Sequence, residues 1–376
     1  MRSKKKVLYI FRRKRKERLE LYEKGEGPDE MLYGLTHLDS QRFRASFIED
    51  DENQWSWWHR LFYPIELEIV RKIKVGFALH LALENLARLK TVDIIITTVD
   101  TCGLPIAMLK YFGIVKTPVI YISQGLSDRL EWLPSNSWTH HFFQTIYSKF
   151  LRAVDRILVL GEGAITPLSK TLAIPIGKIS CLPFGIDQDF WQPSDGSNTE
   201  QYILSVGSDI ARDYQTLLEA ITDQSLKIVT RLPIQHPYLN INTEEQIEIG
   251  SEFSDLELRK LYQKAHFVVT PLQDVAQPSG QSATLQAMAC GKAVILTKTI
   301  GLWDSKTMKH LENCYLVEPN NIESLLEGIC YFWKRPEEVQ RIGRNARTTV
   351  EQFYSSSIFA RKLEIMIENI LDRHLN

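Results

Sequence analysis

Residues 266–297 constrain the fold most, because they hold a buried strand, a turn, a helix and a second strand in one continuous segment. The apolar run His266–Pro271 predicts the first strand, and Ala293–Thr297 predicts the second. Between them lie a small-residue turn, Ser279–Ser282, and an apolar helix that closes at Gly291. Free backbone N–H groups and the positive end of the helix dipole point at this turn. The segment therefore predicts an anion site, of the kind that holds a phosphate in an open α/β sheet.

The same alternation of strand-like and helix-like runs continues along almost the whole chain. Short continuous apolar runs suit parallel strands that are covered on both faces. Further strands are expected at Lys6–Phe11, Val92–Thr97, Pro118–Ile122, Arg156–Leu160, Tyr202–Val206 and Leu226–Thr230, and helices at Leu67–Leu89, Gly103–Phe112, Asp213–Ile221 and Asp255–Ala265. This order predicts an α/β protein built from doubly wound parallel sheets.

The length of the chain, 376 residues, favours two domains over one hydrophobic core. The segment Asp187–Thr199 is rich in Pro, Gly, Ser and Asn and lacks periodicity, so it predicts a linker. We therefore expect a Rossmann-like domain over residues 1–190 and a second one over residues 191–354. Residues 355–376 have helical periodicity, and we expect them to form a helix that packs back on the first domain.

The composition excludes several classes of protein. With 44% hydrophobic and 24% charged residues, the chain is globular and not disordered. A net charge of -1 argues against a nucleic-acid binder that works through bulk charge. The five cysteines are scattered and form no CxxC pair, which argues against a disulfide framework or a zinc site. No apolar run approaches the roughly 18–20 residues of a membrane span, so we expect a cytoplasmic protein, or one on a membrane's cytosolic face.

A second turn at a predicted strand end is expected to contribute to the same anion site. The predicted strand Tyr202–Val206 ends at Gly207, which lets the backbone come close to a ligand. Arg212 follows and can place its forked guanidinium on phosphate oxygens. Taken alone, this segment is better explained as a helix-start loop with a solvated arginine. Together with Ser279–Ser282 it favours a ligand site, because two adjacent strand ends then face one anion.

Three segments in one order resemble the retaining, family-four type of GT-B glycosyltransferases, also described as glycosyl transferases group 1. Ile176–Asp187 resembles a turn that precedes the second domain of that family. Ile203–Gly207 and Thr216–Ala220 resemble the opening of its nucleotide-sugar domain, and Gln277–Ile295 resembles its Glu-containing turn and following helix. The resemblance is close from about residue 156 to residue 354 and weak before that.

This resemblance implies a GT-B fold, with two Rossmann-like domains and an interdomain cleft. It implies transfer of a sugar from a UDP- or GDP-sugar to a hydroxyl acceptor, with retention and with neither metal nor cofactor. The pathway would be the synthesis of a cell-surface polysaccharide or glycolipid. The donor would lie in the C-terminal domain, where stabilisation of the diphosphate supplies most of the catalysis.

Carried onto matching positions, the resemblance assigns the donor to one set of residues: Gly207, Ser208, Arg212, Ser279, Gly280, Gln281, Ser282 and Gln286. The chain departs from the family at both of its glutamate positions: the first is Pro278 or, counted from Gly280, Gln277, and the second is Gln286. A glutamine offers one carbonyl oxygen, where a carboxylate would accept both ribose hydroxyls. Ser208 and Asp213 replace the usual arginine and lysine, so Arg212 is expected to hold the diphosphate. Three readings stay open: an active divergent enzyme, one with an unusual donor, and a weak or inactive nucleotide-sugar-binding relative that acts with a partner.

The N-terminal half supplies further candidates at predicted strand ends. Gln124 stands where the family has a histidine; it can bind a sugar or acceptor but cannot act as a base. Asp100 either positions an acceptor hydroxyl or caps the next helix. Glu162 either contacts the donor or is a turn residue. We take Arg212, Gln124 and Asp100 as the candidate catalytic residues and expect no metal ligand.

A basic run and an aromatic run both fall in the N-terminal half. Arg12–Arg18 and Trp55–Trp58 together suit an anionic membrane surface. A solvated charged face with a packed aromatic lid explains them equally well. The expected acceptor is a sugar or a lipid-linked molecule, and the membrane reading favours the lipid-linked one.

Overall fold

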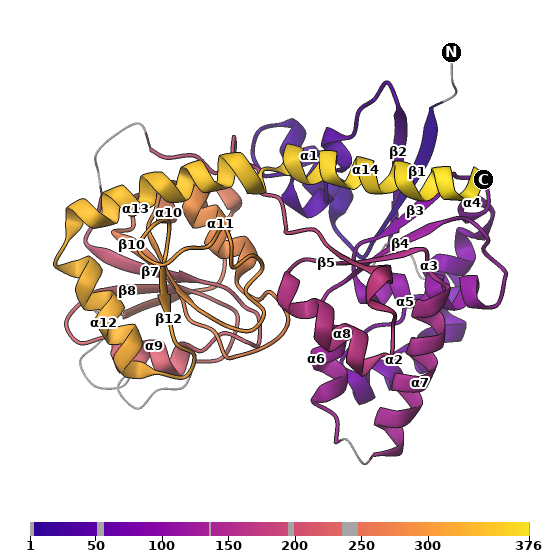
Figure 1. The fold of residues 1–376 in the computed structure, drawn as a ribbon, viewed down its shortest axis with the longest axis horizontal. Coiled ribbons are helices and arrows are strands. Elements are labelled where there is room, and N and C mark those ends of the chain that lie inside the picture. Colours follow the sequence, from indigo (N-terminus) through magenta and orange to yellow (C-terminus); the bar gives the residue numbers. More distant parts are fainter. Residues whose placement is uncertain (1–3, 51–55, 135–136, 195–198, 235–246, 376) are drawn as a thin grey trace. The chain divides into compact units, whose positions relative to one another are not determined.

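The computed structural model describes residues 4–50, 56–134, 137–194, 199–234 and 247–375. The chain divides into two compact units, and each is a layered α/β structure (Figure 1). The N-terminal unit comprises Met1–Glu20, Met31–Pro183 and Phe359–Asn376, and the C-terminal unit comprises Leu21–Glu30 and Phe184–Ile358. The domain limits expected from the sequence stay predictions. Nothing in the sequence marks Leu21–Glu30 as part of the C-terminal unit.

The sheet of the N-terminal unit has six strands in the order β2-β1-β3-β4-β5-β6 within the described residues. The strands are β1 (Lys5–Phe11), β2 (Phe43–Glu49), β3 (Ile94–Thr97), β4 (Val119–Ser123), β5 (Arg156–Val159) and β6 (Ile179–Cys181). All neighbouring strands run parallel. The chain leaves β1 to β2 on one side and then returns to β3 on the other. The carboxyl ends of β1 and β3 therefore form a topological switch point, where sheets of this kind bind ligands.

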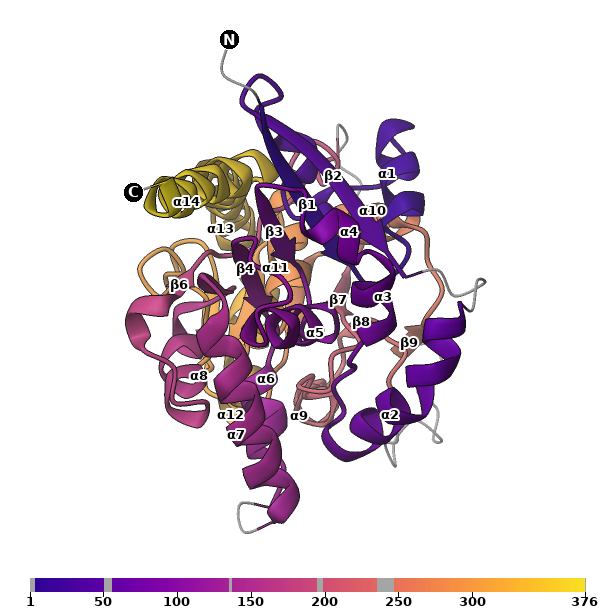
Figure 2. The ribbon, with the colours of Figure 1, turned by 90° about the vertical axis from the view of Figure 1, so that its right-hand side faces the viewer.

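Helices cover both faces of this first sheet. They are α1 (Arg15–Glu23), α2 (Trp57–Ile73), α3 (Leu79–Glu84), α4 (Leu86–Leu89), α5 (Asp100–Tyr111), α6 (Leu126–Glu131), α7 (Trp138–Ala153), α8 (Ile165–Thr171) and α14 (Ser356–Leu375). Leu8 and Ile10 of β1 join the core formed with α5 and α7. On the other side of the sheet lies α14 (Figure 2), where a Cβ added to Gly34 would be 3.1 Å from Ala360.

The single helix predicted over Leu67–Leu89 is wrong, because the chain breaks between α2 and α3. Lys74 caps α2 in the left-handed conformation, with φ 56. Gly76 then passes so close to Thr101 that an added Cβ would lie 2.5 Å from the Thr101 Cγ2 atom. This close approach turns the chain, so that α3 packs back on α2.

The sheet of the C-terminal unit also has six parallel strands, in the order β12-β11-β10-β7-β8-β9 among the described residues. The strands are β7 (Tyr202–Val206), β8 (Ser225–Val229), β9 (Ile247–Gly250), β10 (Phe267–Thr270), β11 (Val294–Thr297) and β12 (Tyr315–Val317). The chain progresses outward from β7 to β9, then crosses to β10 on the other side of β7. The switch point of this sheet therefore lies at the carboxyl ends of β7 and β10.

Two helical layers enclose this second sheet. The helices are α9 (Tyr214–Ala220), α10 (Asp255–Lys264), α11 (Gln281–Ala289), α12 (Ile322–Trp333) and α13 (Pro336–Thr349). In Figure 1, α9 and α12 lie on one side of the strands and α10 and α11 on the other. Leu217 of α9 and Ile329 of α12 share the core on the first side, and Tyr262 of α10 is buried on the second. The predicted fold class, two doubly wound parallel sheets, is confirmed.

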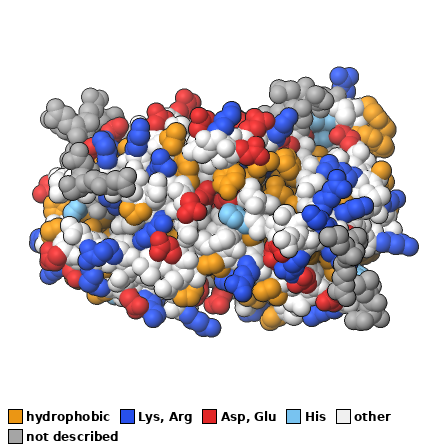
Figure 3. All heavy atoms as spheres, turned by 90° about the horizontal axis from the view of Figure 1, so that it is seen from above, with side chains coloured by type: hydrophobic (Ala, Val, Ile, Leu, Met, Phe, Trp, Pro, Cys, Tyr) orange, Lys and Arg blue, Asp and Glu red, His pale blue; other side chains and the backbone are white. Residues whose placement is uncertain are grey.

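The surface carries side chains of both charge signs, scattered over the face seen in Figure 3. This mixture agrees with the net charge of -1. In the described part of the chain, every helix is too short or too polar to span a bilayer.

Candidate functional site

The loops that follow β7 and β10 are joined by backbone hydrogen bonds at the switch point of the C-terminal unit. Asp213 donates its N–H to the Pro271 carbonyl at 3.1 Å, and Gln273 donates to the Ala211 carbonyl at 2.9 Å. Arg212 forms an isolated antiparallel bridge with Leu272. These bonds bring together the two turns that were predicted to face one anion.

Arg212 lies buried between the two turns, with 7% of its surface exposed. Its Nε and Nη1 atoms are buried without a hydrogen-bond partner among the described residues. Burial lowers the pKa of this guanidinium, against the opposing effect of the neighbouring Tyr214. A buried charge without a partner lowers the stability of a protein by on the order of several kcal/mol. Such an arrangement suits an anion as the partner of these atoms.

The two glycines make room for this guanidinium. A Cβ added to Gly207 would lie 2.2 Å from the Arg212 Nε atom. At Gly280 it would lie 3.2 Å from the Arg212 Nη1 atom and 2.6 Å from the Thr270 Cγ2 atom. Both glycines have positive φ, 149 and 74, so the backbone conformation also favours glycine there.

The N-terminus of α11 faces the same place. Gly280 is its N-cap, and no side chain caps the first turn in the described structure. Ser279 precedes it, with its hydroxyl donating to the Asp209 carboxylate at 3.0 Å. Gln281 is buried and Ser282 is half-buried. The helix dipole and the Arg212 guanidinium thus converge as two positive elements, which suits a phosphate.

Ser208 and Gln286 are held by other parts of the C-terminal unit. The Ser208 hydroxyl accepts the backbone N–H of Arg231 at 2.8 Å, which ties the loop after β7 to the end of β8. The Gln286 amide oxygen accepts the Tyr262 hydroxyl at 3.3 Å, and its nitrogen donates to Glu30 at 3.0 Å. These two bonds leave one further N–H and one further oxygen lone pair of this amide unused.

Comparison with known proteins assigns this unit. Residues 188–349 match the family model described as glycosyl transferases group 1. The C-terminal part of the chain is therefore similar to this family. Residues 188–349 are called the group 1 domain below.

Two curated relatives are similar over part of the chain. An MMP alpha-(1->4)-mannosyltransferase of Mycolicibacterium hassiacum is 22% identical over 237 residues, which cover 59% of this chain and 56% of the relative. The D-rhamnosyltransferase WbpZ of Pseudomonas aeruginosa is 23% identical over 230 residues, 57% of this chain and 59% of the relative. The chain therefore spans little more than half the length of either relative.

Solved structures share the fold over nearly the whole chain. Sucrose-phosphate synthase of Thermosynechococcus elongatus aligns with a TM-score of 0.70 and 15% identity, over 98% of this chain and 100% of that one. HepE of Anabaena, solved in complex with UDP-glucose, aligns with a TM-score of 0.68 and 13% identity, over 97% and 99%. With two parallel α/β sheets already described, these alignments confirm the GT-B fold.

Glu30 is a residue of the site that sequence reasoning missed. Its Oε1 atom accepts the Gln286 amide and the Trp191 indole N–H, the latter at 2.9 Å. Burial raises the pKa of Glu30 to about 8, although the hydrogen bonds from Gln286 and Trp191 oppose this. Glu30 precedes Gln286 by 256 positions, and only the tertiary fold brings the two together.

The raised pKa of Glu30 predicts a pH dependence of stability. Its folded value of about 8 lies above the ordinary 4.5, so the folded chain binds this proton more tightly than the unfolded chain. Stability from this residue is present at low pH and is lost as the pH rises from about 4.5 to about 8. Glu30→Gln is expected to flatten that slope in thermal unfolding measured across about pH 5 to 9. The exposed Glu252→Gln should keep the wild-type slope, and an unchanged slope in Glu30→Gln would show that the carboxyl does not titrate there.

Gly207→Ala is expected to push the Arg212 guanidinium out of place. The added methyl group overlaps the guanidinium and strains a backbone with φ 149. Since a misplacement of about 1 Å can cost a 100-fold loss of rate, turnover of donor should fall by about that factor. Gly177→Ala is the control, because an added Cβ meets nothing within 4 Å there. Wild-type turnover in Gly207→Ala would contradict the placement of Arg212.

In the N-terminal unit, the structure brings Asp100 and Gln124 together. The buried Asp100 carboxylate accepts the Tyr121 hydroxyl at 2.6 Å, the Ser123 hydroxyl at 3.2 Å and the Gln124 backbone N–H at 3.1 Å. Burial raises the pKa of Asp100 to about 6 against these hydrogen bonds. Asp100 lies inside α5, whose N-cap is Val99, so the helix-capping alternative is wrong.

Gln124 and Glu162 differ in their surroundings. The Gln124 amide donates to the Tyr33 hydroxyl at 2.5 Å and to the Thr98 carbonyl at 2.8 Å. It thereby links the end of β3 to Tyr33, which sequence reasoning missed. Glu162 lies exposed in a short 3-10 helix, Glu162–Ala164, after β5.

The basic run after β1 is tied to acidic residues at the end of β2. The Arg13 guanidinium lies 3.3 Å from the Asp50 carboxylate, and the Arg15 backbone N–H donates to Glu49 at 2.5 Å. Trp55 lies outside the described residues. Trp57 is 61% exposed and packs on Trp58, with ring centroids 3.8 Å apart.

Proposed function

We propose that this protein transfers a sugar from a nucleotide diphosphate sugar, with UDP or GDP as the nucleotide, to a hydroxyl acceptor. The observation that carries the proposal is the buried Arg212 guanidinium, whose Nε and Nη1 atoms have no partner among the described residues and whose Nη1 atom lies beside Gly280, the N-cap of α11. Two similar proteins are named as a mannosyltransferase and a rhamnosyltransferase. A third, HepE, is named in complex with UDP-glucose.

In this proposal, negative charge develops on the diphosphate as its bond to the sugar breaks. Arg212 and the backbone N–H groups at the start of α11 stabilise that charge without moving, because the fold has already positioned them. The sugar keeps its anomeric configuration in the product, and no metal is needed for the leaving group. Ser279 and Ser282 are placed to contact the phosphate or the sugar.

Gln286 binds the ribose in this proposal. Its amide has one N–H and one oxygen lone pair left after the bonds to Glu30 and Tyr262. One donor and one acceptor fit a pair of neighbouring hydroxyls. Glu30 positions the amide by accepting its other N–H.

The acceptor contacts of the N-terminal unit are proposed from its switch point. Asp100 and Gln124 position the hydroxyl acceptor, and Glu162 contacts the donor sugar. The acceptor is a sugar or a lipid-linked sugar, in the synthesis of a cell-surface polysaccharide or glycolipid. Trp57 and Leu61 are exposed on α2. Together with the separate basic run Arg12–Arg18, they place the protein on the cytosolic face of a membrane in this proposal.

A panel of UDP-, GDP- and ADP-sugars tests the proposal. Donor binding is measured by calorimetry, and acceptor products are identified by mass spectrometry. Retention is read from the anomeric configuration of the product by NMR. Binding without turnover would favour the weak or inactive relative that acts with a partner. Even a weak specific site binds its ligand at about millimolar concentration. If the protein neither binds nor turns over any donor at that concentration, the proposed function is contradicted.

A further inference from the structure

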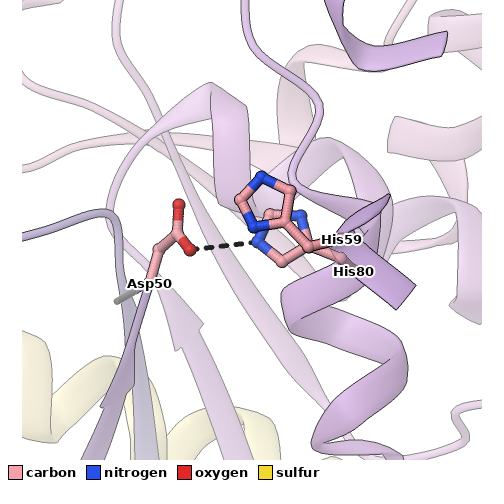
Figure 4. Close-up of side chains that lie close together, drawn as sticks. All are labelled: Asp50, His59 and His80. Atoms are coloured by element: carbon pink, nitrogen blue, oxygen red, sulfur yellow. Dashed lines mark hydrogen bonds and ion pairs between the residues drawn. The ribbon is translucent and has the colours of Figure 1, made fainter. Parts of the chain in front are cut away.

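A cluster of metal-ligating side chains lies in the N-terminal unit, where the end of β2 meets α2 and α3 (Figure 4). Asp50 follows β2, His59 is in the first turns of α2, and His80 is in α3. All three are buried, and one ligand atom from each lies within 4.8 Å of the others. The group 1 domain contributes nothing to this cluster.

We propose that Asp50, His59 and His80 bind a divalent transition-metal ion of the zinc type. Two imidazoles and one carboxylate are a ligand set that such ions favour over the all-oxygen sets of calcium and magnesium. Three protein ligands leave a further coordination position open, as in zinc sites that bind water or an added ligand.

His80 has the surroundings of a ligating histidine. Its Nε2 atom faces Asp50 Oδ1 at 3.0 Å, and its Nδ1 atom lies 2.9 Å from Glu66 Oε1. A histidine that ligates through one nitrogen commonly donates its other N–H to a carboxylate, which fixes the tautomer and the ring orientation. Glu66 therefore supplies the outer partner, and Nε2 is the ligand atom.

The cluster has a path to solvent. Asp50 and His80 line a cavity of about 510 Å³, together with Lys16, Ser56 and Glu84. This space admits a hydrated ion and leaves room for a water molecule in the open position.

One feature must change when the ion binds. The rings of His59 and His80 are stacked, with centroids 4.0 Å apart and planes 10° apart. Each nitrogen lone pair lies in its ring plane, so His59 must turn before both rings can reach one ion. The Asp50 Oδ2 atom accepts a hydrogen bond from Arg13 Nε at 3.3 Å, and the Oδ1 atom is the proposed ligand.

The ion also competes with a proton. Because a ligand nitrogen must lose its proton, His80 Nε2 binds the ion in place of the proton in its present contact with Asp50 Oδ1, 3.0 Å away.

Zinc titration of the full chain, stripped with a chelator, tests this site. One Zn²⁺ per chain is expected, bound more tightly than about 1 μM. His59→Gln and Asp50→Asn should weaken binding at least about tenfold, and Glu66→Gln about tenfold through His80. His141→Gln, an exposed histidine of α7, is the control and should bind as the wild type does. X-ray absorption should show two imidazole nitrogens on the ion.

The result distinguishes a metal site from a group of side chains that are joined only by hydrogen bonds and ion pairs. Circular dichroism in chelator first confirms that each variant is folded. No binding tighter than about 1 μM, or equal binding by wild type and His59→Gln, overturns the proposal. Neither readout depends on sugar transfer, so the proposed function and this site fail or stand separately.

Discussion

Arg212→Met is expected to lower donor turnover by about 100- to 1,000-fold, the usual loss when one preorganised charge-stabilising group is removed. The folded chain should be as stable as the wild type or more stable. The wild-type guanidinium is buried, and its Nε and Nη1 atoms have no partner among the described residues. Methionine fills similar space without the cost of an unpaired buried charge, which suggests a gain of about 1 kcal/mol or more. A substitution that lowers turnover but raises stability indicates that the side chain serves ligand binding and not the stability of the fold.

The comparison needs both readouts on one preparation. Donor turnover and urea unfolding are measured for Arg212→Met and for Arg344→Met, an exposed arginine of α13. The control should change neither quantity appreciably. If Arg212→Met lost several kcal/mol of stability, the guanidinium would be serving the fold, and its role in binding the diphosphate would be contradicted.

Gln286→Glu restores the carboxylate that the family has at this position, yet we expect it to lower the free energy of unfolding. The new carboxylate would replace an amide that donates to Glu30 at 3.0 Å, inside a buried site. Glu30 already holds a proton at neutral pH because its pKa is raised to about 8, so the new carboxyl group must either ionise in a buried place or bind a second proton. We expect a loss of about 2–4 kcal/mol in the unfolding free energy, the cost of burying one more ionisable group.

A reciprocal exchange isolates this contact. Adding Glu30→Gln to Gln286→Glu keeps one carboxylate and one amide across it, so most of the lost stability should return. Gln215→Glu is the matched control, because Gln215 also donates to a glutamate, Glu219 at 3.0 Å, but on the exposed surface of α9. An exposed i,i+4 pair of like charges costs only about 0.5 kcal/mol. Equal losses for Gln286→Glu and Gln215→Glu would contradict the importance of Glu30.

The strands that the sequence predicted are the inner ones of both sheets. Every predicted strand is present, whereas β2, β6, β9 and β12 were not predicted. These four are the edge strands in the observed orders. An inner parallel strand is covered on all sides and shows a continuous apolar run. An edge strand such as β2 (Phe43–Glu49) or β9 (Ile247–Gly250) carries polar residues, so its pattern is weaker.

The candidate site divides in the same way. Gly207, Arg212 and the Ser279–Ser282 turn were predictable, because each follows a recognisable inner strand and chain order alone places it at the switch point. Glu30 was not, since its contact with Gln286 depends on the tertiary fold. The cluster of Asp50, His59 and His80 is unpredictable for that reason too. It forms only because the chain turns back between α2 and α3.

A crystal structure with a bound nucleotide sugar tests the central claim most directly. We expect the diphosphate within hydrogen-bond distance of the Arg212 guanidinium and of the backbone N–H groups at the start of α11, with the ribose against Gln286. A diphosphate bound away from Arg212 and α11 would contradict the account.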